Sequence, residues 1–292
     1  LTKKDLVVDI GSNTGTLLDI FKTLGVKIIG VDPATNLVSI ARSRGIPTLN
    51  NYFLPKVAKK IVKKHHRAKA ITCNNTFDHV DNLHEFVEGI TLLLDPKGIF
   101  IVEVPYFKTM IETQNHVVYH QQIDYLLLTP FRRLVAAHGM EIINAQEIPY
   151  HGGSIRLFIA FKAAYPVNRH VATLIKKEAY ILKNQPKVLA TFSKKLLKQR
   201  DDLATLVGKL KKQGKSIAAV GASAKGSVLL HYCGLGPETI DFITEKSPLK
   251  VGRYTPSGIP VVEDSELFKK QPDYALLLAW NFREEIVSNL SR

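Results

Sequence analysis

The stretch "LVVDIGSNTGTLLDIF", residues 6–21, decides the fold class of this chain. It begins as an apolar strand, passes through a turn with two glycines, and continues with the apolar spacing of an amphipathic helix. Glycines at a strand-to-helix turn let a ligand approach the backbone and the N-terminus of the helix. The stretch therefore predicts an α/β domain that binds a ligand at this turn.

The alternation of strands and helices continues to residue 163. Further strands are predicted at "KIIGVDP", "AITCNN", "IFIVEVP", "MEIINAQEI" and "SIRLFIAF", and helices at about 15–24, 35–44, 54–65, 83–94 and 129–138. Such alternation favours a doubly wound, Rossmann-like parallel sheet with helices on both faces. The last two strands, separated mainly by "PYHGG", predict an antiparallel hairpin at one edge.

The remainder of the chain predicts a second, smaller α/β domain. Residues 164–214 are helical and rich in lysine, and Pro186 can open a helix there because the first turn needs no N–H from it. Strands resume in "SIAAVGASAKGSVLLHYCG", "IDFITEKSP", "IPVVED" and "PDYALLLAW", with helices at "SELFKKQ" and "FREEIVSNLSR". We therefore expect domains at 1–163 and 215–292, joined by a helical connector at 164–214.

The composition narrows the class of protein. The 292 residues are 45% hydrophobic, which is enough for a sizeable core. The sequence has neither a membrane-spanning apolar run nor a signal-peptide pattern, so we expect a cytoplasmic monomer that acts on a small molecule, away from membranes. Its two cysteines, Cys73 and Cys233, form no Cys-x-x-Cys pair, so we predict neither a disulfide framework nor a metal site.

The net charge of +14 is concentrated in "KVAKKIVKKHHRAK", residues 56–69. Its basic residues recur at spacings of three and four with apolar residues between them, as on the solvated face of an amphipathic helix. No aromatic residues interleave with the run, so a nucleic-acid surface is disfavoured. Attraction of an anionic small substrate is the other open interpretation.

The glycine turn narrows the choice of ligand. "DIGSNTG" lacks the third glycine of the dinucleotide fingerprint and the G-K-[ST] ending of a P-loop. Asp9 would repel phosphate but suits an ammonium group, and Asp32, 17 residues after Gly15, can accept hydrogen bonds from a ribose diol. "CNNTFDHV" adds polar groups after a further strand. Each feature alone is compatible with an ordinary turn or a helix cap, but together they predict S-adenosylmethionine or S-adenosylhomocysteine rather than NAD.

At this point the sequence resembles a known family, the S-adenosylmethionine-dependent C-methyltransferases that act on 4-keto deoxysugars carried by a nucleoside diphosphate. The likeness rests on "VVDIGSNTGTLL", "IIGVDPATNLVSIARSRGIPTLN", "CNNTFDHVDNLHEFVEGI", "IFIVEVPY", "YHQQIDYLLLTPF", "IPYHGGSIRLFIA", "VGASAKGSVLLHYCGLG", "KVGRYTP" and "PDYALLLAWNFREEI". The family usually has a zinc-binding segment before the strand at which this sequence starts. That segment normally lines part of the sugar pocket, and the 292 residues do not include it.

The resemblance implies roles for individual residues. It assigns the cofactor to Asp9 (more often Glu in the family), Gly11, Ser12, Asn13, Gly15, Asp32, Pro33, Asn74 and Asn75. It assigns the substrate to Glu103, Tyr106, Arg156, Ala224, Lys225, Gly226, Glu245, Arg253 and Tyr254, with His79 and Tyr119 facing the sugar. The C-terminal domain would hold the nucleotide diphosphate. "GASAKG" could instead be an ordinary turn, and "HGGSIR" a tight hairpin with His151 on the surface.

The stretch "VVYHQQIDY" leaves the catalytic base open. The family has a Glu-His pair where this chain has Gln121 and Gln122, and glutamine has no useful basicity. Methylation at a carbon beside a ketone needs a base to remove a proton. Either His79 takes the proton, or His120 does, or C-methylation is lost in favour of O-methylation or of cofactor binding without turnover. The expected catalytic set is His79, Tyr119, His120, Gln121, Gln122 and His151.

Overall fold

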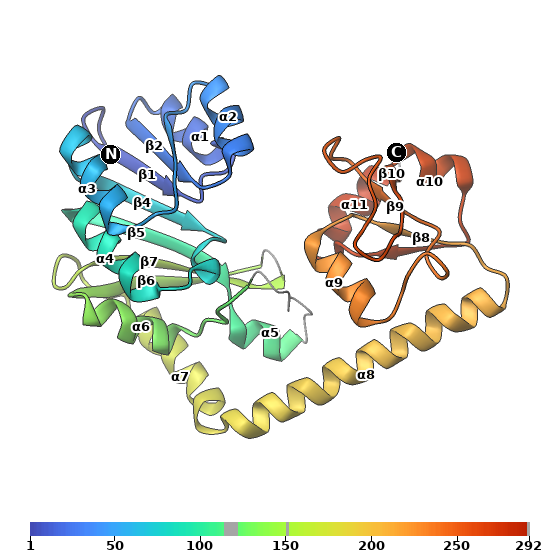
Figure 1. The fold of residues 1–292 in the computed structure, drawn as a ribbon. Helices are drawn as coiled ribbons and strands as arrows, with labels where there is room; N and C mark the ends of the chain where they lie inside the picture. Colours follow the sequence, from blue (N-terminus) through green and yellow to red (C-terminus); the bar gives the residue numbers. More distant parts are fainter. Residues whose placement is uncertain (114–121, 150–151, 291–292) are drawn as a thin grey trace. The chain divides into compact units, whose positions relative to one another are not determined.

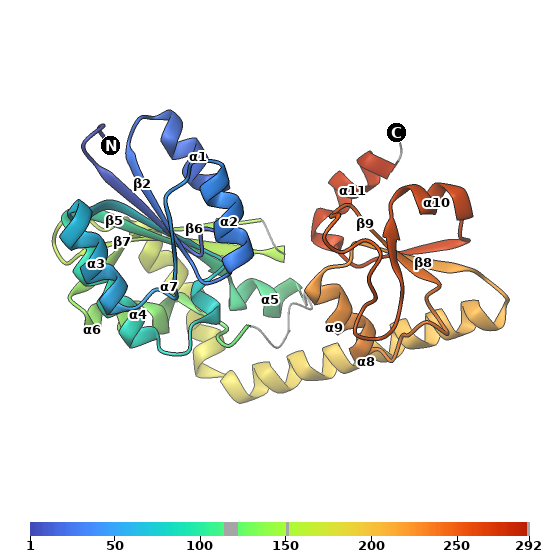
Figure 2. The same ribbon diagram turned by 45° about the horizontal axis from the view of Figure 1, so that its top comes forward.

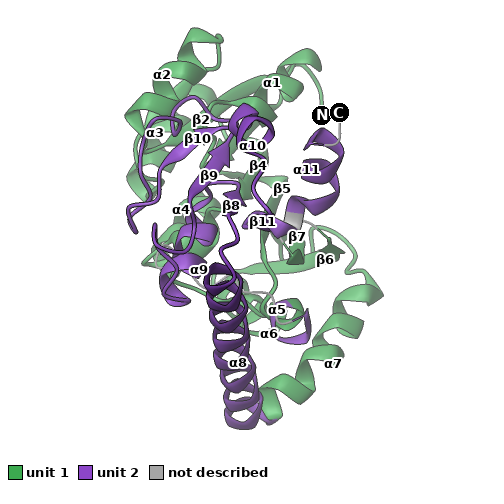
Figure 3. Cartoon of the chain, turned by 90° about the vertical axis from the view of Figure 1, so that its right-hand side faces the viewer, with its two compact units in different colours: residues 1–109, 121–183 green, residues 110–120, 184–292 purple. Residues whose placement is uncertain are grey.

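The structure is a computed structural model that describes residues 1–113, 122–149 and 152–290. The chain divides into two compact units, residues 1–109 with 121–183 and residues 110–120 with 184–292 (Figure 3). Each unit has its own sheet, so the predicted pair of α/β sheets is confirmed. Within the described ranges no helix has the length and apolarity that crossing a bilayer requires.

The first unit follows the predicted alternation of strands and helices (Figure 1). Its elements are β1 (Leu6–Ile10), α1 (Thr16–Thr23), β2 (Lys27–Asp32), α2 (Thr35–Ser43), β3 (Thr48–Asn50), α3 (Pro55–His65), β4 (Ala68–Asn74), η1 (Phe77–His79), α4 (Leu83–Leu93), β5 (Leu94–Pro105), α5 (Phe107–Thr113), α6 (Leu128–Ala137), β6 (Met140–Ile148), β7 (Ser154–Phe161) and α7 (Arg169–Lys183). Every strand and helix predicted before residue 163 is present. The short elements β3, η1 and α5 were not predicted.

The strand order determines where the first unit can bind a ligand. Its described residues form a seven-stranded sheet in the order β3-β2-β1-β4-β5-β7-β6, with β7 antiparallel to both neighbours. The predicted edge hairpin is therefore confirmed. Right-handed crossovers put α1 and α2 on one face and α3, α4 and α6 on the other (Figure 1, Figure 2). The direction of winding reverses beside β1, and ligands of such sheets bind at the carboxyl ends of the strands there.

Burial in the first unit agrees with the sequence pattern. All five residues of β1 are buried, as expected of a central parallel strand covered on both faces. Helix α3 buries Val57, Ala58 and Ile61 and leaves its lysines exposed, so the basic run is the solvated face of an amphipathic helix, as predicted.

Helix α7 is held to the first unit by a buried carboxylate. Glu178 is fully buried and accepts hydrogen bonds from the Tyr106 hydroxyl at 2.8 Å and from the Leu128 and Thr129 backbone N–H groups at 2.5 and 2.8 Å. The Thr129 hydroxyl also donates to it, at 2.6 Å. The latter three bonds cap the N-terminus of α6, where unpaired N–H groups and the helix dipole favour a negative charge.

The second unit contains α8 (Gln185–Lys212), β8 (Ile217–Val220), α9 (Ala224–Tyr232), β9 (Phe242–Glu245), β10 (Val261–Glu263), α10 (Ser265–Lys270), β11 (Tyr274–Leu277), η3 (Trp280–Phe282) and α11 (Arg283–Leu290). Its described residues form a parallel four-stranded sheet in the order β10-β9-β8-β11. The strands and helices predicted for this part of the chain are all present.

The expected connector, residues 164–214, is divided between the two units. Helix α7 packs on β6 and α6 of the first unit. Helix α8 begins with Pro186 in its first turn, and its Leu203, Val207 and Leu210 pack into the core beneath the second sheet. The boundary between the units therefore lies between residues 183 and 184.

Candidate functional site

The glycine turn after β1 has the backbone that its sequence requires. Gly11, Asn13 and Gly15 all have left-handed φ values, of 72°, 51° and 80°. A Cβ atom on Gly11 would overlap the Thr76 hydroxyl, so two loops approach closely here and only glycine fits. The turn leads directly into α1, for which Gly15 is the N-cap.

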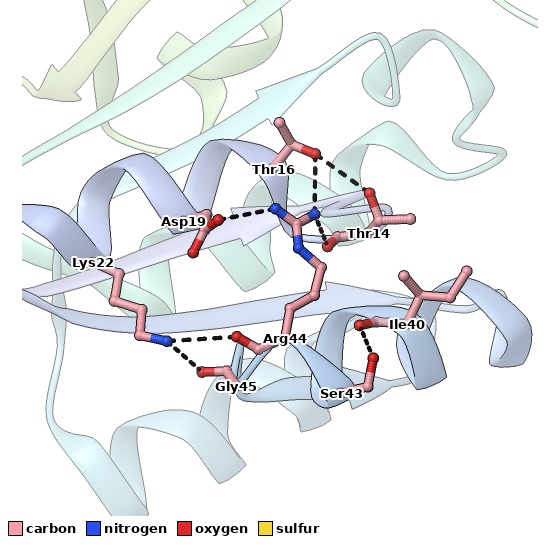
Figure 4. A network of polar contacts seen from close by, with 8 residues as sticks. All are labelled: Thr14, Thr16, Asp19, Lys22, Ile40, Ser43, Arg44 and Gly45. Carbon is pink, nitrogen blue, oxygen red and sulfur yellow. Dashed lines mark hydrogen bonds and ion pairs between the residues drawn. The ribbon is translucent and has the colours of Figure 1, made fainter.

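A polar network fixes the end of this turn to α2 (Figure 4). The Arg44 guanidinium donates to the Thr14 carbonyl at 3.1 Å and pairs with Asp19 at 2.9 Å. Lys22 in turn donates to the Arg44 carbonyl at 3.5 Å. Since the ion pair is well exposed, it adds little stability, and its effect is to hold the turn in place.

Asp32 joins the end of β2 to the glycine turn. Its side chain is buried, and its two oxygens accept backbone N–H groups from Asn13 at 2.8 Å and from Ala34 at 2.9 Å. A carboxylate oxygen can accept more than one hydrogen bond. The residue can therefore organise the turn and still accept bonds from a diol.

Asp9, at the end of β1, is in a different environment. It is 5% exposed, and its carboxyl accepts a hydrogen bond from the Thr72 hydroxyl at 2.6 Å. Burial raises the pKa of Asp9 to about 7; the bond from Thr72 opposes this shift and the charge of Asp32 adds to it. The site thus contains a carboxyl group that gains or loses its proton near neutral pH.

A cavity of about 440 Å³ opens at the carboxyl ends of β1 and β2. Of the residues predicted for the site, Gly11, Pro33 and His79 line it. Asp9 and Asp32 are not among the lining residues, but their neighbours in sequence, Ile10 and Val31, are. Sequence reasoning missed the rest of the wall: Asn51, Tyr52, Phe53, Leu54, Thr76, Val80, Asp81, Asn82, Glu85 and Phe86.

The missed part of the wall comes from the loops after β3 and β4 and from the first turn of α4. Phe53 and Phe86 meet edge to face with ring centroids 5.2 Å apart, and Phe77 packs on Phe86 at 5.3 Å. Phe53 and Phe86 line the cavity and supply the apolar surface that a small-molecule site needs, and Phe77 supports them from behind. The sequence signal that could have identified these residues is their position, because each loop follows a strand that ends at the carboxyl edge of the sheet.

The predicted catalytic residues are only partly described. Tyr119, His120, Gln121 and His151 lie outside the described residues. Gln122 is buried, and its side-chain nitrogen donates to the Asp124 carbonyl at 3.4 Å.

His79 is the candidate base that the structure describes. It ends η1, its side chain is 29% exposed, and its Nε2 lies 3.9 Å from Asp78 Oδ2. Since it also lines the cavity, an imidazole is available to the interior of the site.

The remaining residues predicted in the first unit lie near the carboxyl edge of the sheet. Arg156 and Glu103, on paired strands, form an ion pair at 2.7 Å. Tyr106 is fully buried with its hydroxyl bonded to Glu178. Asn74 and Asn75 follow β4, where the Asn75 N–H donates to the Glu103 carbonyl at 2.8 Å.

A second cavity, of about 280 Å³, lies at the carboxyl ends of β8 and β9 in the second unit. Its wall includes Gly221, Ser223, Thr244, Glu245 and Lys246, together with side chains of α11. Ser223 caps α9 by accepting the Gly226 N–H at 3.0 Å. Thr244 is fully buried, and its hydroxyl has no hydrogen-bond partner among the described residues. An unpaired buried hydroxyl on a cavity wall can bind a polar ligand group.

The residues predicted to hold a nucleotide are spread over this region. Glu245 lines the cavity and pairs with Lys250 at 3.1 Å, and Lys250 also donates to the Ala222 carbonyl at 3.0 Å. Ala224, Lys225, Gly226, Arg253 and Tyr254 are not among the lining residues of this cavity. Arg253 and Tyr254 are exposed to solvent.

Known proteins match both units. Residues 2–145 match a family model described as a methyltransferase domain, and residues 149–292 match one described as a C-methyltransferase C-terminal domain. The C-methyltransferase NovU of Streptomyces niveus is 36% identical over 292 residues, covering 99% of this chain and 70% of NovU.

Solved structures of S-adenosylmethionine-dependent methyltransferases are also similar to part of the chain. One from Archaeoglobus fulgidus is 13% identical with a TM-score of 0.47, covering 54% of this chain and 86% of its own. One from Anabaena variabilis is 15% identical with a TM-score of 0.45, covering 56% and 79%.

Proposed function

Because this chain belongs to the C-methyltransferase family, we propose that it methylates a carbon atom of a deoxysugar carried by a nucleoside diphosphate. It is an S-adenosylmethionine-dependent methyltransferase, and the proposal concerns its acceptor. The observation that carries it most directly is the imidazole of His79 on the wall of the cofactor cavity. C-methylation beside a ketone requires a base at such a position.

The residues around the first cavity fit the cofactor. Gly11 and Pro33 line the cavity, and the buried carboxyl groups of Asp9 and Asp32 are next in sequence to its wall residues Ile10 and Val31. S-adenosylmethionine supplies an electrophilic methyl group on a sulfonium, together with an ammonium group and a ribose diol. Asp9 suits the ammonium group, and Asp32 suits the diol.

In the proposed reaction, the His79 imidazole removes the proton from the sugar carbon beside the keto group. The electron pair left on that carbon forms the new bond to the methyl group. The bond between methyl and sulfur breaks, and its electrons remain on sulfur. The proton leaves the imidazole to water, which restores the base.

O-methylation is the second candidate, and the glutamines favour it. Gln122 is buried and acts as a hydrogen-bond donor, and neither it nor Gln121 can take a proton. A hydroxyl acceptor starts from a far more acidic group than a carbon acid. It would therefore need less help from a base.

We assign the nucleotide part of the substrate to the second unit. Glu245, Asp264 and Glu285 are part of the wall of its cavity, which also presents the buried Thr244 hydroxyl and the exposed Lys246. Hydroxyl and ammonium groups are suitable donors for a diphosphate. The substrate is then a small molecule bound by a monomer.

The test is a methyl-transfer assay with nucleotide-linked 4-keto sugars, with the position of the new methyl group read by NMR. We expect wild type to transfer to carbon and His79→Asn to lose about 10²–10⁴-fold in rate, as for the removal of a general base. His170→Asn, at an exposed position in α7, is the matched control and should keep full activity.

The double variant Gln121→Glu/Gln122→His separates the two acceptors. If wild type is silent and the double variant gains C-methylation, the natural protein is not a sugar C-methyltransferase. If His79→Asn keeps full activity, His79 is not the base.

A further inference from the structure

Two buried carboxyl groups, Asp9 on β1 and Asp32 on β2, are next in sequence to residues of the cofactor cavity's wall and have unequal hydrogen-bond support. Both oxygens of Asp32 accept backbone N–H groups, from Asn13 and Ala34. Asp9 accepts from the hydroxyl of Thr72, while burial works against its charge. A buried carboxyl group whose charged form has little hydrogen-bond support keeps its proton more readily.

The surroundings of Asp9 do not supply a compensating positive charge. Asp32 faces it from β2 and adds to its tendency to bind a proton. From β4, Cys73 is fully buried, and desolvation holds its thiol pKa well above the usual value, so this group is neutral. Asp78 of η1 adds a further carboxyl group near Cys73. Within the described residues, no ion pair joins Asp9 or Asp32 to a basic side chain.

We propose that Asp9 carries a proton in the free enzyme and releases it to solvent when the cationic cofactor binds. The cofactor's positive charge then attracts the ionised Asp9 carboxylate. Release is a simple exchange, because one proton leaves the Asp9 carboxyl as one cation enters the site. The inference rests on the cofactor alone and is independent of the acceptor.

The exchange favours turnover. S-adenosylmethionine carries a sulfonium and an ammonium group, whereas the product S-adenosylhomocysteine retains only the ammonium. Loss of the sulfonium charge reduces the electrostatic stabilisation of the Asp9 carboxylate, so this group binds a proton again more readily. Reprotonation of Asp9 should therefore assist product release.

The experiment is titration calorimetry of the full chain in two buffers of different ionisation enthalpy, which counts protons released per cofactor. Work between pH 6 and pH 7 keeps the cofactor's own α-amino group largely protonated. With a free-state pKa of about 7 for Asp9, we expect about 0.9 proton released at pH 6 and about 0.5 at pH 7. Cofactor affinity should rise about fivefold over the same interval.

Two variants and two ligands make the test decisive. Asp9→Asn should bind more weakly and release no proton, with an affinity that is independent of pH. Thr72→Val removes the donor to Asp9 while keeping the side chain's shape, so the release curve should move to higher pH. S-adenosylhomocysteine should release less than S-adenosylmethionine. Proton release below about 0.1 in wild type, or equal release in Asp9→Asn, overturns the proposal.

Discussion

The two units arrange their first four strands in the same order, yet they present different groups to a ligand. In chain order within each unit, β3-β2-β1-β4 and β10-β9-β8-β11 both run third, second, first, fourth. Both cavities lie at the carboxyl end of the first strand, where the order reverses. In the first unit Asp9 and Asp32 are buried there, whereas the second unit buries the hydroxyl of Thr244.

The difference shows that topology and side chains determine separate properties of a binding site. Strand order determines where the binding site lies, because it determines where loops diverge to opposite faces of the sheet. The residues at the strand ends determine the charge of the ligand. The same strand order therefore presents a different set of polar groups at each cavity.

The largest effect on stability and cofactor binding is expected when the glycine in the turn after the first strand of a unit is replaced by alanine. Gly11→Ala would force a left-handed φ of 72° on alanine and overlap the Thr76 hydroxyl. Strain and overpacking together should cost about 3–5 kcal/mol, with loss of measurable cofactor binding. Gly221→Ala, at a φ of 90° with the Ala279 Cβ at 3.0 Å, should cost less, about 1–2 kcal/mol, and leave cofactor binding intact. Calorimetry measures the cofactor affinity of the two variants and thermal unfolding measures their stability. Equal losses in the two variants would contradict the expected difference between the turns.

The next effect is the change in stability at pH 8 when a carboxyl group is replaced by an amide, and it has opposite signs in the two units. The folded pKa of Asp9, about 7, exceeds its unfolded value of 3.8, so its stabilising contribution is complete below pH 3.8 and is lost as the pH rises to 7. Asp9→Asn should therefore stabilise the cofactor-free protein at pH 8, by about 2–4 kcal/mol.

The opposite sign is expected at Glu245. Burial opposes its charge, but the Ser247 N–H and Lys250 hold its pKa below the usual value. Its stabilising contribution is therefore present above the unfolded pKa and lost in acid. Glu245→Gln should destabilise slightly at pH 8, by less than about 1 kcal/mol, because the pair with Lys250 is partly exposed. Urea unfolding of both variants at pH 5 and pH 8 tests the signs, and a destabilised Asp9→Asn at pH 8 contradicts them.

A smaller effect is expected on cofactor affinity from Asp32→Ala. The variant removes the acceptor for Asn13 and Ala34 and for the ribose diol, so binding should weaken by about 1.5–3 kcal/mol. Glu263→Ala, an exposed carboxylate at the end of β10 in the second unit, is the control. Binding that is unchanged in Asp32→Ala would exclude a diol contact.

The smallest effect is expected at Thr244. Thr244→Val removes the unpaired hydroxyl, so the ligand-free protein should gain about 1 kcal/mol in stability. Affinity for a nucleoside diphosphate should fall about tenfold, if the hydroxyl binds that ligand. Thermal unfolding and calorimetry read the two changes separately. A stabilised variant with unchanged affinity would remove Thr244 from the proposed nucleotide site.

The sequence predicts much of the fold and the centre of the cofactor site. Most strands contain a run of apolar residues that marks them, and Asp9 and Asp32 follow from their places at strand ends. By contrast, β3 has the sequence TLN, with a single large apolar residue, so neither the strand nor the loop after it was predicted. Tyr52 and Phe53 of the cavity wall lie in that loop and were therefore not predicted.

Other features depend on partners distant in sequence. The contrast between Asp9 and Asp32 comes from Thr72 on one side and backbone N–H groups on the other, which no local pattern reveals. Helical spacing at 164–214 indicates helices but does not show which sheet each one covers. The roles of Tyr119, His120, Gln121 and His151 remain predictions.

Glu178 determines where the chain can be cut. It lies 15 residues beyond position 163, in a lysine-rich helix, yet it supplies the acceptor for the start of α6 and for Tyr106. A fragment ending at 163 would lose that acceptor and expose the apolar side of β6 and α6 that α7 covers. A fragment ending at 183 keeps both, and is therefore the shortest piece from residue 1 that we expect to fold autonomously.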